Sequence, residues 1–217
     1  MTSEKILEML HDGKIEELEK ILQNEIYKKS LKNNGSAAKR YKAMERYFKT
    51  LYENQREEMS KPCKNISVFG KNYTCFIDGY CIALTTESIG NIEEYDNSNN
   101  TYFDVEKMVD YFSMANETKE VNISEILANA KSKGYKYKKC EYWTGEKANY
   151  LLKINDCYVK IGLLDKAFSI INDGNNAELY YINRVSPILI KNELGIALVL
   201  PINMNETMEK NYTIINA

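Results

Sequence analysis

The sequence contains few of the residues that build reactive centres and covalent frameworks. It has a single histidine, His11, and its cysteines are odd in number and form no Cys-X-X-Cys pair: Cys63, Cys75, Cys81, Cys140 and Cys157. A Ser-His-Asp triad and most catalytic zinc sites need an imidazole. An odd number of cysteines argues against a disulfide framework, and the absence of a Cys-X-X-Cys pair argues against a zinc ribbon. We therefore expect reduced, mostly buried thiols, no metal site and no cofactor.

Long hydrophobic runs are also absent. The longest apolar stretch covers residues 196–200 and stops at Pro201, whereas a helix that crosses a bilayer needs about 20 residues. The first residues, Met-Thr-Ser-Glu-Lys, lack the pattern of a secretory signal. These features predict a cytoplasmic protein that does not contact the membrane.

Catalytic motifs are missing as well. The sequence shows no phosphate-binding loop, no dinucleotide-binding glycine pattern, no nucleophile elbow and no metal-ligand spacing. The acidic pairs Glu93–Glu94 and Asp104–Glu106 lie in polar or helix-start positions, where solvation or the helix dipole explains a carboxylate. We expect no catalytic residues and predict a binding protein rather than an enzyme.

The composition is that of a globular protein, and the basic and acidic residues are concentrated in different segments of the chain. Its 217 residues are 44% hydrophobic and 28% charged, which suffices for a core without covalent cross-links. The net charge is only −2, yet residues 27–50 hold eight basic side chains and one acidic one. Residues 85–125 reverse the balance with ten acidic and two basic side chains. Such segregation permits a phosphate-attracting face on an acidic protein, or a surface that is merely solvated.

The first third of the chain has helical periodicity. Residues 1–35 read as a helical hairpin in which Ser3 caps the first helix, and Ser36 would cap a third helix over residues 37–58. The third helix has an apolar face, and its other faces are strongly basic. Its basic residues are nucleic-acid candidates, although a core stripe with solubilising lysines explains them equally well: Lys39, Arg40, Lys42, Arg46 and Lys49.

After Pro62 the periodicity changes to that of strands. Residues 65–69, 72–77 and 80–86 are predicted strands, and Asp78-Gly79 supplies a tight turn between the last two. Residues 88–100 form a polar loop, residues 121–130 a short helix and residues 133–143 a strand in which lysine and tyrosine alternate. That strand would suit stacking on bases through Lys136 and Lys138, or would simply turn its tyrosines inward.

The C-terminal part predicts a β-α-β-β-β order. A strand at 157–161 leads into a helix, and strands follow at 177–182, 187–191 and 196–202. Residues 102–114 can be aligned with residues 158–170, which suggests a duplicated strand-helix unit. The resulting fold class is α+β, with a helical N-terminal region followed by antiparallel sheet with helices packed on one face.

Two passages resemble the bacterial DNA sliding clamp, the processivity factor of the replicative polymerase. Residues 76–83, Phe-Ile-Asp-Gly-Tyr-Cys-Ile-Ala, are similar to the clamp's Thr-Asp-Gly-His-Arg-Leu-Ala segment, and residues 198–204, Leu-Val-Leu-Pro-Ile-Asn-Met, are similar to its closing strand. Clamp domains consist of two helix-plus-three-strand halves. The resemblance implies a single clamp-like domain over residues 36–204 with an insertion at 95–146. Residues after 204 are polar, which predicts a flexible tail at 205–217. The richness in lysine, asparagine, isoleucine and tyrosine suits a genome of low GC content, and we expect a phage or prophage origin.

In that family the two passages border a hydrophobic groove that receives a short peptide from polymerases and other clients. The resemblance implies such a groove here, and it would bury leucine or phenylalanine anchors of replication proteins. An ordinary core role is the alternative for its residues: Ile77, Gly79, Tyr80, Ile82, Val199, Leu200, Pro201, Ile202 and Met204. Because a clamp ring needs six domains, encirclement of DNA would require a homo-oligomer. We expect a non-enzymatic clamp-like binding protein in DNA replication or its regulation; the alternative is a nucleic-acid-binding module that uses helix 37–58 and strand 133–143.

Overall fold

The computed structural model of the chain describes most of the helices and strands that these patterns predict. The described residues are 2–53, 63–68, 70–77, 80–87, 105–112, 115, 117–136, 150–204 and 210–216. The predicted turn at Asp78-Gly79 and the polar loop at 88–100 lie outside these ranges.

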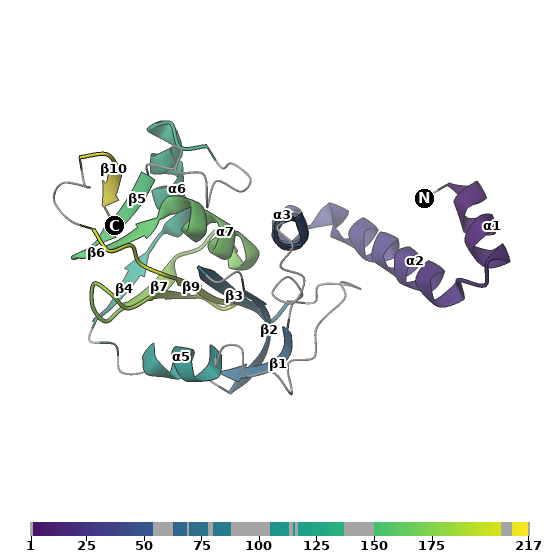
Figure 1. Cartoon of the computed structure of the whole chain (residues 1–217), viewed down its shortest axis with the longest axis horizontal. Coiled ribbons are helices and arrows are strands. Elements are labelled where there is room, and N and C mark those ends of the chain that lie inside the picture. Colours follow the sequence, from purple (N-terminus) through teal and green to yellow (C-terminus); the bar gives the residue numbers. More distant parts are fainter. Residues whose placement is uncertain are drawn as a thin grey trace.

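Helices and strands are mixed along the chain (Figure 1). The helical segments are α1 (Ser3–His11), α2 (Ile15–Ser30), the 3-10 helix η1 (Leu31–Asn33), α3 (Gly35–Glu53), α5 (Val105–Tyr111), α6 (Ile123–Ser132) and α7 (Ile161–Ile171). The strands are β1 (Cys63–Val68), β2 (Lys71–Ile77), β3 (Cys81–Thr85), β4 (Glu117–Val121), β5 (Tyr150–Ile154), β6 (Cys157–Lys160), β7 (Ala177–Tyr181), β8 (Ile188–Lys191), β9 (Gly195–Val199) and β10 (Thr213–Asn216).

A seven-stranded antiparallel sheet organises the body of the protein. Its strand order is β1-β2-β3-β9-β8-β7-β4. The predicted β2–β3 pair and the β7–β8–β9 meander are confirmed, and the β3–β9 ladder joins them into one continuous sheet. Each group of three strands follows a helix, in the orders α3-β1-β2-β3 and α7-β7-β8-β9. The sheet therefore consists of two halves with the same order of elements.

The sheet separates two hydrophobic cores because successive side chains of a strand point to opposite faces. Cys81 and Ala83 of β3 lie in the core that contains α7, whereas Ile82 and Leu84 lie in the core that contains α5. Figure 1 shows α7 and α5 on opposite sides of the sheet. The predicted α+β class is confirmed, and α5 adds a helix on the face opposite α7.

A second, smaller sheet lies against the α7 side of the body. Its order is β10-β5-β6, with β10 parallel to β5 and β6 antiparallel to it. Ile215 of β10 is fully buried in the core that contains α7. The prediction of a flexible tail is thus wrong for residues 213–216, because Thr-Ile-Ile-Asn buries apolar side chains and pairs with β5.

Helices α1 and α2 form an arm that projects from the body (Figure 1). The threonine side chain of Thr2, rather than Ser3, caps α1 by accepting the Lys5 N–H at 3.5 Å. Likewise Asn34, rather than Ser36, caps α3, because its side-chain oxygen accepts the Ala37 N–H at 3.0 Å. The predicted pair of N-terminal helices is present, and α3 begins at Gly35, two residues before the start that the predicted cap Ser36 implied.

The segment between the two halves of the large sheet contains the short helix predicted at 121–130, which is α6, and a strand, β4, that the sequence did not predict. β4 is the edge strand beside β7, and α6 contacts α7 and β10. α6 ends at Ser132 and is followed by a turn through Gly134, whose φ is +99°. The predicted strand at 133–143 is therefore wrong for residues 133–136, which contain no strand; residues 137–143 lie outside the described ranges.

The predicted strand-helix repeat does not join equivalent parts of the fold. Val105 and its aligned counterpart Ile161 are the first residues of the helices α5 and α7, and the strand β6 precedes α7, while residues 102–104 lie outside the described ranges. α5 and α7 pack on opposite faces of the large sheet. The few identities between the two segments therefore do not reflect equivalent positions in the fold.

Cys75, Cys81 and Cys157 are reduced and buried, as expected for structural cysteines. Cys140 lies outside the described residues, and the side chain of Cys63 is not described. Within the described part of the chain, no helix combines the length and apolar character that a bilayer crossing requires.

Candidate functional site

The two passages that resemble the sliding clamp are direct neighbours in the structure. β3 and β9 pair from Cys81↔Val199 to Thr85↔Gly195. Beyond the end of the ladder, the N–H of Leu200 donates to the carbonyl of Tyr80 at 2.9 Å. The sheet therefore brings residues 80–83 and 198–200 together although more than a hundred residues separate them.

The chain after β9 then connects the large sheet to the small one. Pro201 forms an isolated bridge with Val159 of β6, and the N–H of Ile202 donates to the Tyr158 carbonyl at 2.7 Å. The side chains of Tyr80 and of residues 200–202 and 204 are half-buried. We call this group the apolar edge: Tyr80, Leu200, Pro201, Ile202 and Met204.

The remaining groove candidates do not share this exposure. Val199 is fully buried in the core that contains α7, and Ile82 is buried in the core that contains α5. Ile77 is half-buried and packs on the α5 side, opposite Ile82 in the β2–β3 ladder. Gly79 lies outside the described residues. The structure thus brings five of the nine candidates together at the apolar edge and separates Ile77, Ile82 and Val199 from it.

A lysine and a tyrosine of the small sheet lie beside the apolar edge. Tyr158, whose carbonyl binds Ile202, also has the Lys153 ammonium 5.1 Å from its ring centroid. This spacing is typical of a cation–π contact. No local pattern indicated these two residues, because only the bridge from residues 201–202 to β6 places them next to the edge.

Burial raises the pKa of the thiol at the start of β6. Cys157 is fully buried, and burial, with a smaller contribution from the Asp156 carboxylate, raises its pKa to about 11. A thiol with such a pKa is almost entirely protonated at neutral pH and is a poor nucleophile or metal ligand. Cys157 is therefore a structural residue.

The nucleic-acid candidates fall into two groups. Lys39, Lys42 and Arg46 of α3 and Lys136 after α6 have exposed side chains. The side chain of Lys49 and the whole of Lys138 are outside the described part. Lys131 and Lys133, which were not among the candidates, are also exposed and lie at the end of α6.

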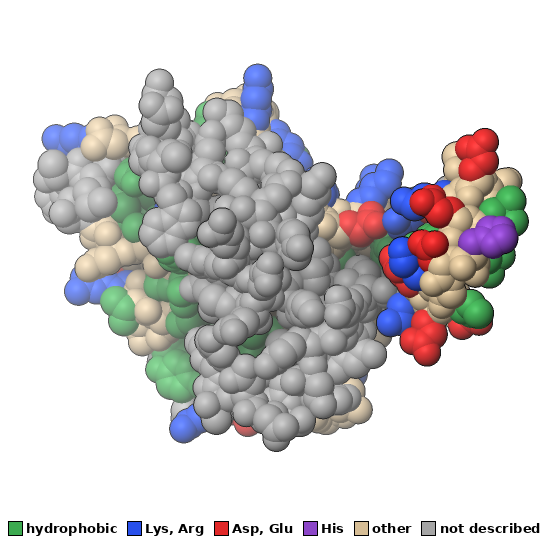
Figure 2. Space-filling view, turned by 45° about the vertical axis from the view of Figure 1, so that its right-hand side comes forward, with side chains coloured by type: hydrophobic (Ala, Val, Ile, Leu, Met, Phe, Trp, Pro, Cys, Tyr) green, Lys and Arg blue, Asp and Glu red, His purple; other side chains and the backbone are tan. Residues whose placement is uncertain are grey.

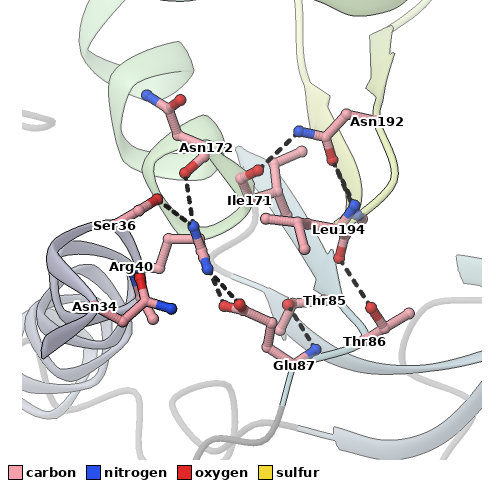
Figure 3. Close-up of polar contacts among 12 residues, drawn as sticks. Asn34, Ser36, Arg40, Thr85, Thr86, Glu87, Ile171, Asn172, Asn192 and Leu194 are labelled. Atoms are coloured by element: carbon pink, nitrogen blue, oxygen red, sulfur yellow. Dashed lines mark hydrogen bonds and ion pairs between the residues drawn. The ribbon is translucent and has the colours of Figure 1, made fainter. Parts of the chain in front are cut away.

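Arg40 is the exception, and its predicted exposure is wrong. Its side chain is only 7% exposed and forms a bidentate ion pair with Glu87, with Arg40 Nε 2.6 Å from Glu87 Oε2. The guanidinium also donates to the Ser36 hydroxyl at 2.6 Å and to the Asn172 carbonyl, at the end of α7, at 3.2 Å (Figure 3). Arg40 therefore joins α3 to the end of β3 and to α7.

Basic side chains of α3 and α6 act on one carboxylate of α7. Burial raises the pKa of Asp165, while Lys131, the hydrogen bond from the Tyr135 hydroxyl and Arg46 lower it. The Tyr135–Asp165 hydrogen bond is 3.2 Å long. Lys131 of α6 and Arg46 of α3 therefore both lie near Asp165.

α7 cannot present side chains to a ligand along its length. Eight of its residues are buried, including Lys166. Its neighbours are α3, α6, β3, β9 and the small sheet. Near Asp165, exposed basic side chains therefore come from α3 and the end of α6, not from α7.

Among the described residues, no three histidine, cysteine, aspartate or glutamate side chains are close enough to hold a metal ion. The polar side chains of the region instead hold elements in place. Asn192, for example, donates to the Ile171 carbonyl at 2.8 Å and accepts the N–H groups of Leu194 and Gly195 (Figure 3).

The fold is an α+β fold with an antiparallel seven-stranded sheet between helices. No protein family and no curated protein matches the sequence. One solved structure that is similar to part of the chain is a "Putative DNA polymerase III beta subunit" from Eubacterium rectale, with 15% sequence identity and a TM-score of 0.34. The similarity covers 63% of this chain and 43% of that one. The chain thus matches less than half of the length of that structure.

Proposed function

We propose that the protein is a non-catalytic, clamp-like binding protein in DNA replication or its regulation, and that it receives a short apolar peptide at the apolar edge. The observation that carries this proposal is the hydrogen bond between Leu200 and Tyr80, which joins the two clamp-like passages. The repeated order α3-β1-β2-β3 and α7-β7-β8-β9 supports it, because clamp domains have two such halves.

The side chains of the edge suit this role. Tyr80, Leu200 and Ile202 are half-buried, so each is held by the body and keeps part of its apolar surface accessible. A peptide that covers this surface with leucine or phenylalanine gains about 1.5–3 kcal/mol for each buried anchor. Residues 200–202 are fixed at both ends by Tyr80 and Tyr158, so little ordering of the protein opposes binding.

Fluorescence anisotropy tests the proposal. A fluorescein-labelled peptide that carries leucine and phenylalanine anchors of the clamp-binding type is titrated with the wild-type protein and with Tyr80→Ala and Ile202→Ala. We expect saturable binding by the wild type and a loss of affinity of at least about tenfold in each variant. Tyr111→Ala is the matched control for Tyr80→Ala, because Tyr111 is exposed on α5 at the opposite face of the sheet.

The control variant should bind the peptide as the wild type does. Absence of binding by the wild type, or equal affinities of all variants with unchanged circular dichroism, would contradict the peptide site.

The exposed basic side chains favour nucleic-acid binding as a second candidate function. Arg46 of α3 and Lys131 of α6 both lower the pKa of Asp165, and Lys42 is exposed one helical turn before Arg46. Phosphate contacts by such side chains release counterions, so binding to a labelled single strand should weaken steeply between about 50 and 200 mM salt.

Lys42→Glu is expected to reduce both the affinity for the strand and its salt dependence. Lys71→Glu is the control, since Lys71 is an exposed lysine at the start of β2. If the wild type does not bind a single strand at 50 mM salt, the nucleic-acid function is wrong, whatever the outcome of the peptide titration.

A further inference from the structure

The N-terminal arm, formed by α1 and α2, concentrates exposed apolar side chains. Of the seven large hydrophobic side chains that are exposed in the described part of the molecule, five lie on the arm: Leu7, Leu10, Ile15, Leu22 and Ile26. Figure 2 shows the arm standing clear of the body, with hydrophobic side chains at its surface among charged ones. Exposed apolar groups gathered in this way are typical of an interaction surface.

The arm is attached firmly at its base. The Lys28 ammonium lies 2.9 Å from the Glu45 carboxylate of α3, and the Tyr41 hydroxyl donates to Asn24 at 2.7 Å. The rings of Tyr27 and Tyr41 also pack edge to face, with centroids 5.3 Å apart. These contacts hold α2 against α3, so the apolar side chains farther along α2 are kept away from the body.

Three of the exposed residues form one stripe along α2. With 3.6 residues per turn, Ile15, Leu22 and Ile26 fall within about 40° of one another around the helix axis. Ile26 is 67% exposed and Ile15 is 54% exposed. A narrow apolar stripe of this kind is the pattern by which one helix packs along another.

The charges of α2 indicate the direction of the partner helix. Glu16, Glu17 and Glu19 follow Ile15, whereas Lys29 and Lys32 follow Ile26, and all five side chains are exposed. A second α2 that runs antiparallel would place the acidic end of each helix beside the basic end of the other. A parallel arrangement would place like charges together, which disfavours it.

We propose that the arm is a homodimerisation surface, on which the α2 stripe of one copy packs antiparallel against the α2 stripe of a second copy. A two-fold axis between residues 20 and 21 places Ile15 of each copy beside Ile26 of the other and the two Leu22 side chains close to the axis, and Leu7 and Leu10 of α1 extend the apolar surface of the arm. The surface is distinct from the apolar edge, so this inference does not depend on the proposed function.

The mass of the protein in solution tests the dimer. Light scattering coupled to size-exclusion chromatography should give twice the 25.2 kDa of the chain for the wild type. Leu22→Asp and Ile26→Asp should run as monomers, or raise the dimer dissociation constant by at least about tenfold. Both side chains are exposed, so the helical circular dichroism should be unchanged.

Val185→Asp is the matched control, since Val185 is an exposed apolar residue of the body and the substitution introduces the same charge. It should remain dimeric. A wild type that stays monomeric up to about 100 µM, a concentration that covers specific homodimers of moderate affinity, overturns the proposal. So does a dimer that Leu22→Asp and Ile26→Asp leave intact.

Cysteine cross-linking tests the orientation. Along a helix, positions 15 and 26 are about 16 Å apart, whereas a disulfide requires Cα atoms within about 7 Å. A mixture of Ile15→Cys and Ile26→Cys proteins should therefore form a mixed disulfide dimer on mild oxidation, and Ile15→Cys alone should not. Self-cross-linking of Ile15→Cys without mixed dimers would overturn the antiparallel arrangement, and the wild type controls for native thiols.

Discussion

Ala83 of β3 and Ala197 of β9 face each other at the centre of the ladder that joins the two halves of the large sheet. β1 and β7 begin at residues 63 and 177, and β3 and β9 begin at 81 and 195, so the same interval separates the strands of these two pairs and also separates the two alanines. Residues at equivalent positions pair with each other only where a local two-fold axis crosses a ladder. The β3–β9 ladder therefore contains the symmetry axis that relates the halves.

The register on either side of the alanines has the same symmetry. Cys81 pairs with Val199 and Thr85 pairs with Gly195, so the start of each strand faces the end of the other. Both alanines are fully buried on the α7 side, where α7 contacts both strands. Small side chains at the axis allow the helix to lie close to the sheet.

Removal of the Arg40 guanidinium should destabilise the protein. Arg40→Ala leaves Glu87 without its partner and the Asn172 carbonyl without a donor. Because Glu87 is itself 24% exposed, we expect a loss of about 2–3 kcal/mol in the free energy of unfolding, below the usual cost of breaking a fully buried pair. Urea denaturation measures it.

The neighbouring exposed residue of α3 provides the control, since Lys39→Ala should change the free energy of unfolding by less than about 0.5 kcal/mol. Equal stability of Arg40→Ala and Lys39→Ala would contradict the structural role of the ion pair.

Gly195 should not tolerate a side chain. A Cβ at this position would lie 1.9 Å from the Leu84 carbonyl oxygen and 2.7 Å from Ile171 Cγ2. Relief of these contacts requires the β3–β9 ladder or α7 to move, so Gly195→Ala should lower the free energy of unfolding by at least about 3 kcal/mol. Chemical denaturation measures the loss.

Gly35→Ala is the matched control. Nothing lies within 4 Å of a Cβ at Gly35, the first residue of α3, so the same substitution should be neutral or slightly stabilising. A Gly195→Ala protein as stable as Gly35→Ala would show that the strands are not packed as described.

Replacement of the Asp165 carboxylate by an amide should stabilise the folded protein at neutral pH. Burial raises its pKa in the folded state, so its contribution to stability is present below the pKa of the unfolded chain and is lost as the pH rises through the folded-state pKa. Asp165→Asn should therefore be more stable than the wild type at pH 7, and the difference should shrink below about pH 4.

Denaturation at the two pH values gives the comparison, with the exposed Asp110→Asn as control. A carboxylate titration followed by NMR gives the direction independently, since Tyr135→Phe removes a hydrogen bond that lowers the pKa and should raise it further. A destabilised Asp165→Asn at pH 7 would mean that Lys131 and Arg46 outweigh burial.

The thiol of Cys157 should make stability fall in alkaline solution. Its pKa in the folded state is raised from 9.0 to about 11, mainly by burial. The folded protein is therefore stabilised by the protonated thiol below pH 9, and this contribution, about 2 kcal/mol, is lost as the pH rises from 9 towards 11.

Cys157→Ala lacks this thiol, so its free energy of unfolding should decline less steeply between pH 9 and pH 11. The other titrating groups are the same in both proteins, so their effects cancel when the two curves are subtracted. Parallel curves for the two proteins would contradict the assignment. Reaction of Cys157 with a thiol reagent at pH 8 should require unfolding, since the side chain is fully buried.

Local sequence patterns predicted the helices and strands that are formed by neighbouring parts of the chain. The β7–β8–β9 meander and α7 follow from strands of alternating or continuous apolar residues between turn residues such as Asn192 and Gly195. β4 and β10 were missed for different reasons. Glu-Thr-Lys-Glu-Val has no apolar alternation because most of β4 is exposed at the sheet edge, and β10 is a four-residue strand whose partner β5 lies some sixty residues earlier.

Features that depend on distant residues could not be predicted from local patterns. Arg40 resembles the other basic residues of its helix, and only Glu87 and Asn172, which are 47 and 132 residues away, make it a buried residue. The true internal repeat shares an order of elements but not helix length, since α3 has 19 residues and α7 has 11. Of the peptide-site candidates, Ile82 and Val199 lie within β3 and β9 and are buried because both faces of the large sheet are covered, whereas Tyr80 and residues 200–202 lie beyond the strand ends and stay half-buried.

β3 and β9 belong to both hydrophobic cores at once, with α7 above them and α5 below. A local opening of either layer leaves these strands covered by the other, so their amides can meet solvent only when both layers separate. Deuterium uptake should therefore be slowest at the shared strands, and the exchange rate there should report the global unfolding of the body.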